Sequence, residues 1–173
     1  MTERITTGKT RLDTILGGGL SRNAINLVIG IPGSGKTILA QQCAFANATE
    51  DRPAVYFSTV SEPLEKMLRF GQGLTFFDVS SVGEQIVYED LGSVLGPHGL
   101  DGVVDQVREC IRDRQPSMIV IDSFKALSAY GDESEFRQFL HLLTRTLSAF
   151  PVTSLWIGEY EPTDIAVAPE FAV

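Results

Sequence analysis

The stretch from Gly30 to Thr37 has the residue types and the spacing needed to bind phosphate. Its pattern is Gly30-x-x-x-x-Gly35-Lys36-Thr37. The glycines at 30, 33 and 35 allow the backbone to curl so that successive amide N–H groups converge on an anion. Lys36 suits the β- and γ-phosphates of a nucleotide, and the Thr37 hydroxyl suits a Mg²⁺ ion. These residues predict a nucleoside triphosphate site.

Such a loop needs a strand before it and a helix after it, and the sequence supplies both. An apolar run of strand length is formed by Ile25, Leu27, Val28 and Ile29. The segment 36–48 is rich in Ala and Gln without Gly or Pro, as is typical of a helix. The helix dipole would add positive potential at the loop. A glycine-rich turn that merely contains a lysine does not require this context. The expected phosphate-binding residues are Gly30, Ile31, Pro32, Gly33, Ser34, Gly35, Lys36, Thr37 and Ile38.

Asp122 is the candidate for holding the metal together with Thr37. It ends the apolar run that begins at Met118. An acid at the carboxyl end of a parallel strand lies in the crevice where ligands bind, and it can hold Mg²⁺ directly or through water. The alternative is an N-cap for a helix that begins at Ser123. The phosphate loop favours the metal role.

Glu62 is the candidate for activating the attacking water. Glu62 and Lys36 are the two expected catalytic residues. It follows a predicted strand at 54–60 and faces the same crevice if the strands are parallel. A carboxylate there can orient water toward the γ-phosphorus. An acid in the first turn of a helix, stabilising the dipole, is the alternative, and spacing alone does not separate the two roles. Glu159, after the last predicted strand, is a weaker candidate of the same kind.

Composition limits the class of protein. The chain has 173 residues, which favours one domain, and its net charge of −8 argues against an extended nucleic-acid-binding surface. No apolar run reaches the length of a membrane span and the N-terminus lacks the apolar core of a signal peptide, so we expect a cytoplasmic protein without a membrane partner. Cys43 and Cys110 fall in predicted helices and are expected to be core thiols in a reducing compartment.

Predicted strands and helices alternate along the chain. This alternation predicts an α/β fold with a mostly parallel central sheet flanked by helices. The segment 91–99 contains three glycines and a proline and is expected to be loop. The strands are expected at 25–29, 54–60, 85–88, 117–122 and 152–157, and the helices at 9–16, 36–48, 61–70, 101–114 and 133–150.

The ordered set of motifs resembles the KaiC-like ATPases of the RecA superfamily. Thr7-Gly8, Asp13 and the run 17–20 resemble the opening Thr-Gly…Asp…Gly-Gly-Leu signature of that family. The loop at 30–37 matches its phosphate loop, and 117–123 matches its Ile-Asp-Ser motif. The family has two adjacent catalytic glutamates, of which this chain retains Glu62, while Ser61 stands at the position of the first.

The resemblance implies a RecA-like P-loop sandwich of three layers, formed by 1–173 as a single domain that hydrolyses ATP with Mg²⁺. It implies a homo-oligomer, a hexameric ring in the longer parent, whose hydrolysis is coupled to signalling or a protein partner. The family domain continues for several more strands that carry trans-acting Lys and Arg residues. We therefore expect this chain to be truncated at its C-terminal side.

Two other functions compete with this interpretation. A DNA-handling motor of the recombinase or helicase type would need a basic, glycine-rich loop after Asp122, whereas 124–135 carries one lysine and three acids. A nucleotide-binding assembly module with little hydrolysis would have the same motifs. Turnover with and without DNA separates the three.

Overall fold

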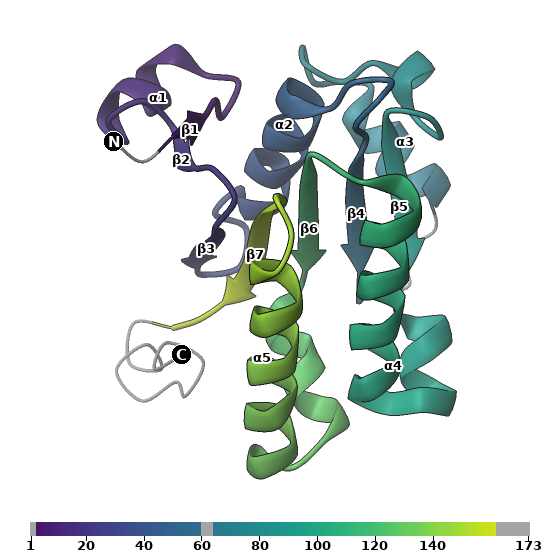
Figure 1. The fold of residues 1–173 in the computed structure, drawn as a ribbon. Coiled ribbons are helices and arrows are strands. Elements are labelled where there is room, and N and C mark those ends of the chain that lie inside the picture. The colour runs from purple at the N-terminus through teal and green to yellow at the C-terminus, as the bar shows by residue number, and fades with distance from the viewer. Residues whose placement is uncertain (1–2, 60–63, 162–173) are drawn as a thin grey trace.

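The computed structural model describes residues 3–59 and 64–161 and has a parallel five-stranded sheet at its centre (Figure 1). The sheet order is β3-β7-β6-β4-β5, and every neighbouring pair is parallel. These strands are β3 (Ile25–Gly30), β4 (Ala54–Ser58), β5 (Ile86–Asp90), β6 (Met118–Asp122) and β7 (Thr153–Glu159). The order and direction confirm the predicted α/β, RecA-like architecture.

Helices cover both faces of the sheet and make three layers. The α-helices are α1 (Thr10–Ile15), α2 (Lys36–Asn47), α3 (Leu64–Gly71), α4 (Gly92–Arg114) and α5 (Glu133–Ser148), with short 3₁₀ helices η1 (Val79–Ser81) and η2 (Phe124–Tyr130). On the face of α2 and α3, Val120 and Leu155 pack with Ala40, and Met67 lies against this cluster. No helix of the described part is long and apolar enough to cross a membrane.

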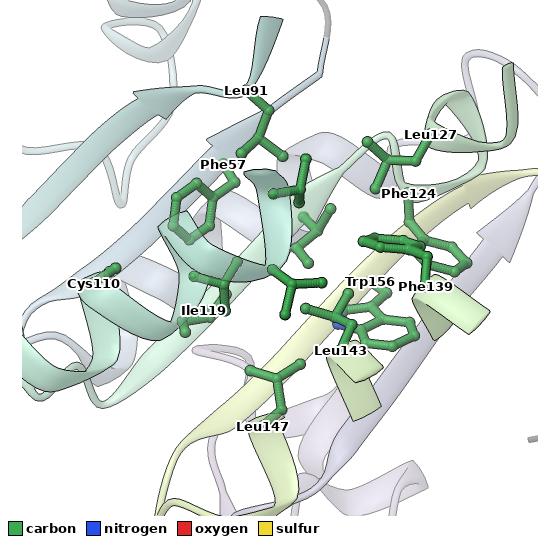
Figure 2. Close-up of a cluster of buried hydrophobic side chains, with 14 of the residues drawn as sticks. Phe57, Leu91, Cys110, Ile119, Phe124, Leu127, Phe139, Leu143, Leu147 and Trp156 are labelled. Atoms are coloured by element: carbon green, nitrogen blue, oxygen red, sulfur yellow. The ribbon is translucent and has the colours of Figure 1, made fainter. Parts of the chain in front are cut away.

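The larger core lies on the opposite face, beneath α4 and α5. Figure 2 shows Phe57, Ile119 and Trp156 of the sheet packed with Leu143 and Leu147 of α5. Alternate residues of β6 therefore enter different cores, which explains why its sequence is apolar without a break. Because the strands run parallel, the carboxyl ends of the central strands come together at one end of the sheet, where polar residues follow them.

The strand that leads into the phosphate loop, β3, lies at an edge of the sheet as far as the structure describes it. The β3 residues are half-buried, except Leu27, whose exposed fraction is 41%, whereas the central strands are almost wholly buried. Leu27 thus presents an apolar side chain to solvent beside unpaired backbone groups. Such an edge strand can pair with another β-strand.

The prediction of a loop at 91–99 is wrong. Helix α4 begins at Gly92 and contains one non-helical residue, Gly99, with φ of 58° and ψ of −152°. Leu91 is the N-cap and makes no side-chain cap bond, but the residue before it, Asp90, accepts from Gly92 N at 2.9 Å through its Oδ1. Leu91 and Leu95 are buried in the larger core. Burial of these leucines outweighs the poor helix propensity of the glycines, which cost about 1 kcal/mol each relative to alanine.

The two cysteines are free and buried, as expected for core thiols. Cys43 lies on α2 and Cys110 on α4, on opposite faces of the sheet. Burial raises the pKa of each thiol to about 12. Both side chains are therefore neutral packing groups at neutral pH.

The N-terminal segment forms a small unit against α2. Two short strands, β1 (Arg4–Ile5) and β2 (Leu20–Ser21), pair antiparallel and enclose α1. The sequence-based expectation contained the helix but not this pair. Gly19 at the turn into β2 has φ of 112°, and a Cβ there would lie 2.0 Å from the Ile5 carbonyl oxygen. Only glycine allows the two strands to approach this closely.

Asp13 holds the N-terminal segment together. Its carboxylate accepts from Thr6 Oγ1 at 2.5 Å, Thr7 Oγ1 at 2.6 Å and Thr7 N at 2.7 Å. These bonds, that from Thr6 first, hold the pKa of Asp13 below its ordinary value. The Thr6 and Thr7 carbonyls then accept from Asn47 at 2.8 Å and Gln42 at 2.9 Å. The segment is therefore bound to α2, the helix that follows the phosphate loop.

Asp13→Asn is expected to lower the thermal unfolding midpoint at pH 7, because an amide cannot accept all three bonds. A lowered native pKa stabilises the fold above the unfolded pKa of about 4, and this contribution is lost as pH falls through the native value. The difference between wild type and variant should therefore shrink below pH 4. The control is Asp105→Asn, an exposed carboxylate that pairs with Arg108. Equal midpoints for wild type and Asp13→Asn at pH 7 would contradict the assignment.

Candidate functional site

The loop between β3 and α2 leaves open space at the carboxyl edge of the sheet. Gly33 and Gly35 have φ of 75° and 87°, left-handed values that favour glycine. Adjoining residues aside, no atom lies within 4 Å of a Cβ built at either position. Gly35 is the N-cap of α2 and provides no side-chain bond to the helix. The N–H groups of the first helical turn are therefore suited to an anion bound in the loop.

Lys36 is folded back over this loop. Its side chain is 7% exposed, and its Nζ donates to the Ile31 carbonyl at 2.8 Å. The carboxylate of Glu159, at the end of β7, lies 3.8 Å away and is about half exposed. Solvent screens this ion pair, so its contribution to stability is small. A phosphate could exchange with these partners, because it offers Lys36 stronger charge-assisted hydrogen bonds.

The structure brings Thr37 and Asp122 together. Thr37 Oγ1 donates to Asp122 Oδ2 at 2.8 Å. The hydroxyl of Tyr56, on β4, donates to the same oxygen. Burial and, secondly, the charge of Asp122 raise the pKa of Tyr56 well above its ordinary value of about 10. The phenol therefore stays protonated and acts as a donor.

Asp122 is not a helix cap. The N-cap of η2 is Ser123, and it makes no side-chain bond to that helix. Both hydrogen bonds to the Asp122 carboxylate from the described residues reach Oδ2, which leaves Oδ1 without a donor among them. Oxygen donors of this kind fit Mg²⁺, which proteins hold through one or two carboxylates together with substrate phosphates. Within 3–59 and 64–161, no group of three or more His, Cys, Asp or Glu is placed to bind a metal alone.

Glu62, the predicted water-activating residue, lies outside the described residues. Thr59 is the last residue described before it. The Thr59 N–H donates to the Asp122 carbonyl at 2.8 Å, and Thr59 Oγ1 accepts from Ser123 N at 2.9 Å. The chain therefore leaves β4 directly beside Asp122. Glu159, the weaker candidate, lies near Lys36.

A cavity of about 520 Å³ opens beside Thr37 and Asp122. Its wall from α3 and the following turn is apolar, and Phe70 on this wall is 69% exposed. Ser58, directly opposite Asp122 in the sheet, lies on the polar side. The cavity is also lined by Ile38, Met67, Leu74, Ser123 and Glu159. One side of the cavity thus carries Thr37 and Asp122, the expected metal ligands, and the other side is apolar.

Tyr56 is the site residue that sequence reasoning missed. It belongs to a strand of apolar and aromatic residues, which is typical of a buried core. The available signal is a hydroxyl-bearing side chain two residues before Ser58, at the carboxyl end of a parallel strand. Its contact with Asp122 spans 66 positions and depends on the order of the strands.

The parallel sheet with a glycine-rich loop between strand and helix defines a P-loop domain of the type that binds nucleoside triphosphates. The family model described as "ATPase: KaiC" matches residues 5–168. The chain belongs to this KaiC ATPase family. This confirms the resemblance that the motifs indicated.

Similar proteins include UPF0273 proteins and circadian clock proteins. A UPF0273 protein of Aeropyrum pernix is 27% identical, over 95% of this chain and 71% of the relative. A UPF0273 protein of Thermotoga maritima is also 27% identical, over 95% of this chain and 73% of its own length. The circadian clock oscillator protein KaiC of Synechococcus elongatus is 27% identical, over 88% of this chain but 29% of the relative.

Lys36→Ala is expected to weaken binding of Mg-ATP by roughly a hundredfold, since loss of a charged hydrogen bond costs about 1.5–3 kcal/mol. Isothermal titration of the folded variant measures the change. Arg108→Ala, on α4 and on the other face of the sheet, is the matched loss of a cation and should bind normally. Unchanged affinity in Lys36→Ala would exclude the loop as the phosphate site.

Proposed function

We propose that the chain binds ATP with Mg²⁺ and hydrolyses it to ADP and phosphate. The observation that carries this proposal is the 2.8 Å bond between Thr37 and Asp122, next to Lys36 in the loop. It joins a phosphate-binding element to a metal-type carboxylate across 85 positions of sequence. Membership of the KaiC ATPase family supports the same activity.

Each group has a distinct task. The backbone N–H groups of 30–38, apart from Pro32, which has none, and the Lys36 amine bind the β- and γ-phosphates. The Thr37 hydroxyl and the Asp122 carboxylate hold Mg²⁺, which when bound neutralises charge on the phosphate oxygens. The positive charge of Lys36 acts in the same way on the transferred γ-phosphoryl group.

Glu62 is proposed to orient the attacking water. In support, Thr59, three positions earlier in the chain, follows the end of β4 and hydrogen-bonds to Asp122 and Ser123. Glu159 competes for this role, since it also follows a strand end. Its position 3.8 Å from the Lys36 amine fits a second task, which is to orient the lysine over the phosphate loop.

Glu62→Gln is expected to keep nucleotide affinity while turnover falls roughly a hundredfold, because the amide hydrogen-bonds water but is a poor base. Glu159→Gln makes the same change at the end of β7 and should reduce turnover by a smaller factor. Phosphate release and ATP titration on both variants separate chemistry from binding. A larger loss of turnover in Glu159→Gln would exchange the two roles.

Addition of DNA is expected to leave the rate unchanged, in line with the net charge of −8. DNA-stimulated turnover would favour the motor alternative. Binding without turnover in the wild type would favour the assembly module.

We further propose that the protein works as a homo-oligomeric ring coupled to a protein partner in signalling. Exposed apolar side chains at the edge strand and the phosphate loop support assembly: Leu27 is 41% exposed and Ile31 51% exposed. Light scattering with an ATP analogue measures whether a regular assembly forms. One defined mass that is a multiple of the mass of one chain supports the ring, whereas monomers or a broad spread of masses argue against it.

A further inference from the structure

Tyr56 is buried in the core, and its hydroxyl reaches the carboxylate of Asp122, the expected metal ligand. It lies on β4 opposite Val120 of β6. Asp122 is two residues further along β6 and therefore lies on the same face of the sheet. Such diagonal neighbours are within reach of an aromatic side chain. The ring is 1% exposed, and its hydroxyl donates to Asp122 Oδ2.

The ring of Tyr56 is held firmly. Tyr88, its direct neighbour on β5, packs against it with ring centroids 5.4 Å apart. Thr37, by contrast, lies in the first turn of α2 at the rim of the phosphate loop, and its hydroxyl is the group expected to turn toward a bound ion. Of the two donors to Oδ2, the phenol is therefore the one that stays in place when the site is filled.

We propose that Tyr56 is a positioning residue for the divalent cation of this site. By holding Asp122 Oδ2, it directs Oδ1, which has no donor among the described residues, toward the coordination shell of Mg²⁺. The inference rests on the proposed function, since it assumes that Asp122 serves a nucleotide-bound ion. Partners that orient ligating carboxylates typically change metal affinity by about 10–100-fold when removed.

The competing explanation is that Asp122 only satisfies a buried phenol. Buried hydroxyls need a partner, and Tyr56→Phe would then cost a little stability without affecting the metal. Tyr88 offers a matched control. Its hydroxyl is also buried, with no hydrogen-bond partner in the described chain, and its ring lies beside that of Tyr56. Tyr88→Phe removes the same atom without touching Asp122.

The test measures Mn²⁺ binding by electron paramagnetic resonance in the presence of a non-hydrolysable ATP analogue. Tyr56→Phe should raise the Kd for Mn²⁺ about tenfold or more, whereas Tyr88→Phe should match the wild type. Affinity for the analogue in EDTA should be the same in all three proteins, because the phosphate loop is intact. In an Asp122→Asn background, Tyr56→Phe should have no further effect on Mn²⁺.

A second measurement uses the wild type and does not depend on the folding of Tyr56→Phe. The chain contains four tyrosines, so ¹³Cζ-tyrosine resonances can be assigned with Phe variants at 88, 130 and 160 and by elimination. Addition of Mg²⁺ to the analogue complex should shift the Tyr56 signal and leave that of Tyr88 in place. An unshifted Tyr56 signal would overturn the proposal.

The outcomes also separate this inference from the proposed function. Equal Kd values for Mn²⁺ in Tyr56→Phe and Tyr88→Phe, with metal-dependent nucleotide binding in the wild type, would overturn the positioning role alone. A wild type that binds the analogue equally well with Mn²⁺ and with EDTA would overturn both.

Discussion

The two hydrogen bonds to one oxygen of Asp122 are the interaction on which the site depends. Thr37 donates from the first turn of α2, Tyr56 donates from the middle of β4, and Asp122 itself ends β6. Three elements are thereby fixed relative to one another at the carboxyl edge of the sheet. Parallel register makes this geometry possible, because it places the ends of β4 and β6 side by side, with Ser58 opposite Asp122.

The phosphate loop at 30–37 contributes hydrogen-bond donors to the site and contains no acidic residue. Its open glycine backbone and the start of α2 favour an anion, while Lys36 lies buried against the Ile31 carbonyl. Glu159 is near enough to attract the amine and exposed enough for that attraction to be screened. A nucleotide phosphate can therefore exchange with these partners at small cost.

The opening Thr-Gly…Asp signature of the family has a structural explanation in this chain. Asp13 gathers the N–H and hydroxyl groups of the preceding threonines, and their carbonyls accept from Gln42 and Asn47 of α2. Gly8, with φ of 80°, comes so close to α2 that a Cβ would lie 3.1 Å from the Cβ of Ala46. The segment thus packs against α2 and supports this helix, whose first turn contributes to the site.

The sequence alone determined the phosphate loop at 30–37, its flanking strand and helix, and the parallel α/β class, because these depend on short-range spacing and on burial of both faces of each strand. It did not determine the helical start of 91–99, where burial of leucines overcame local propensity, and Glu62 remains a prediction. Tertiary structure alone decided that Tyr56 meets Asp122. That contact arises between strands far apart in the chain, and strand order is settled by how whole faces pack, which no local pattern encodes.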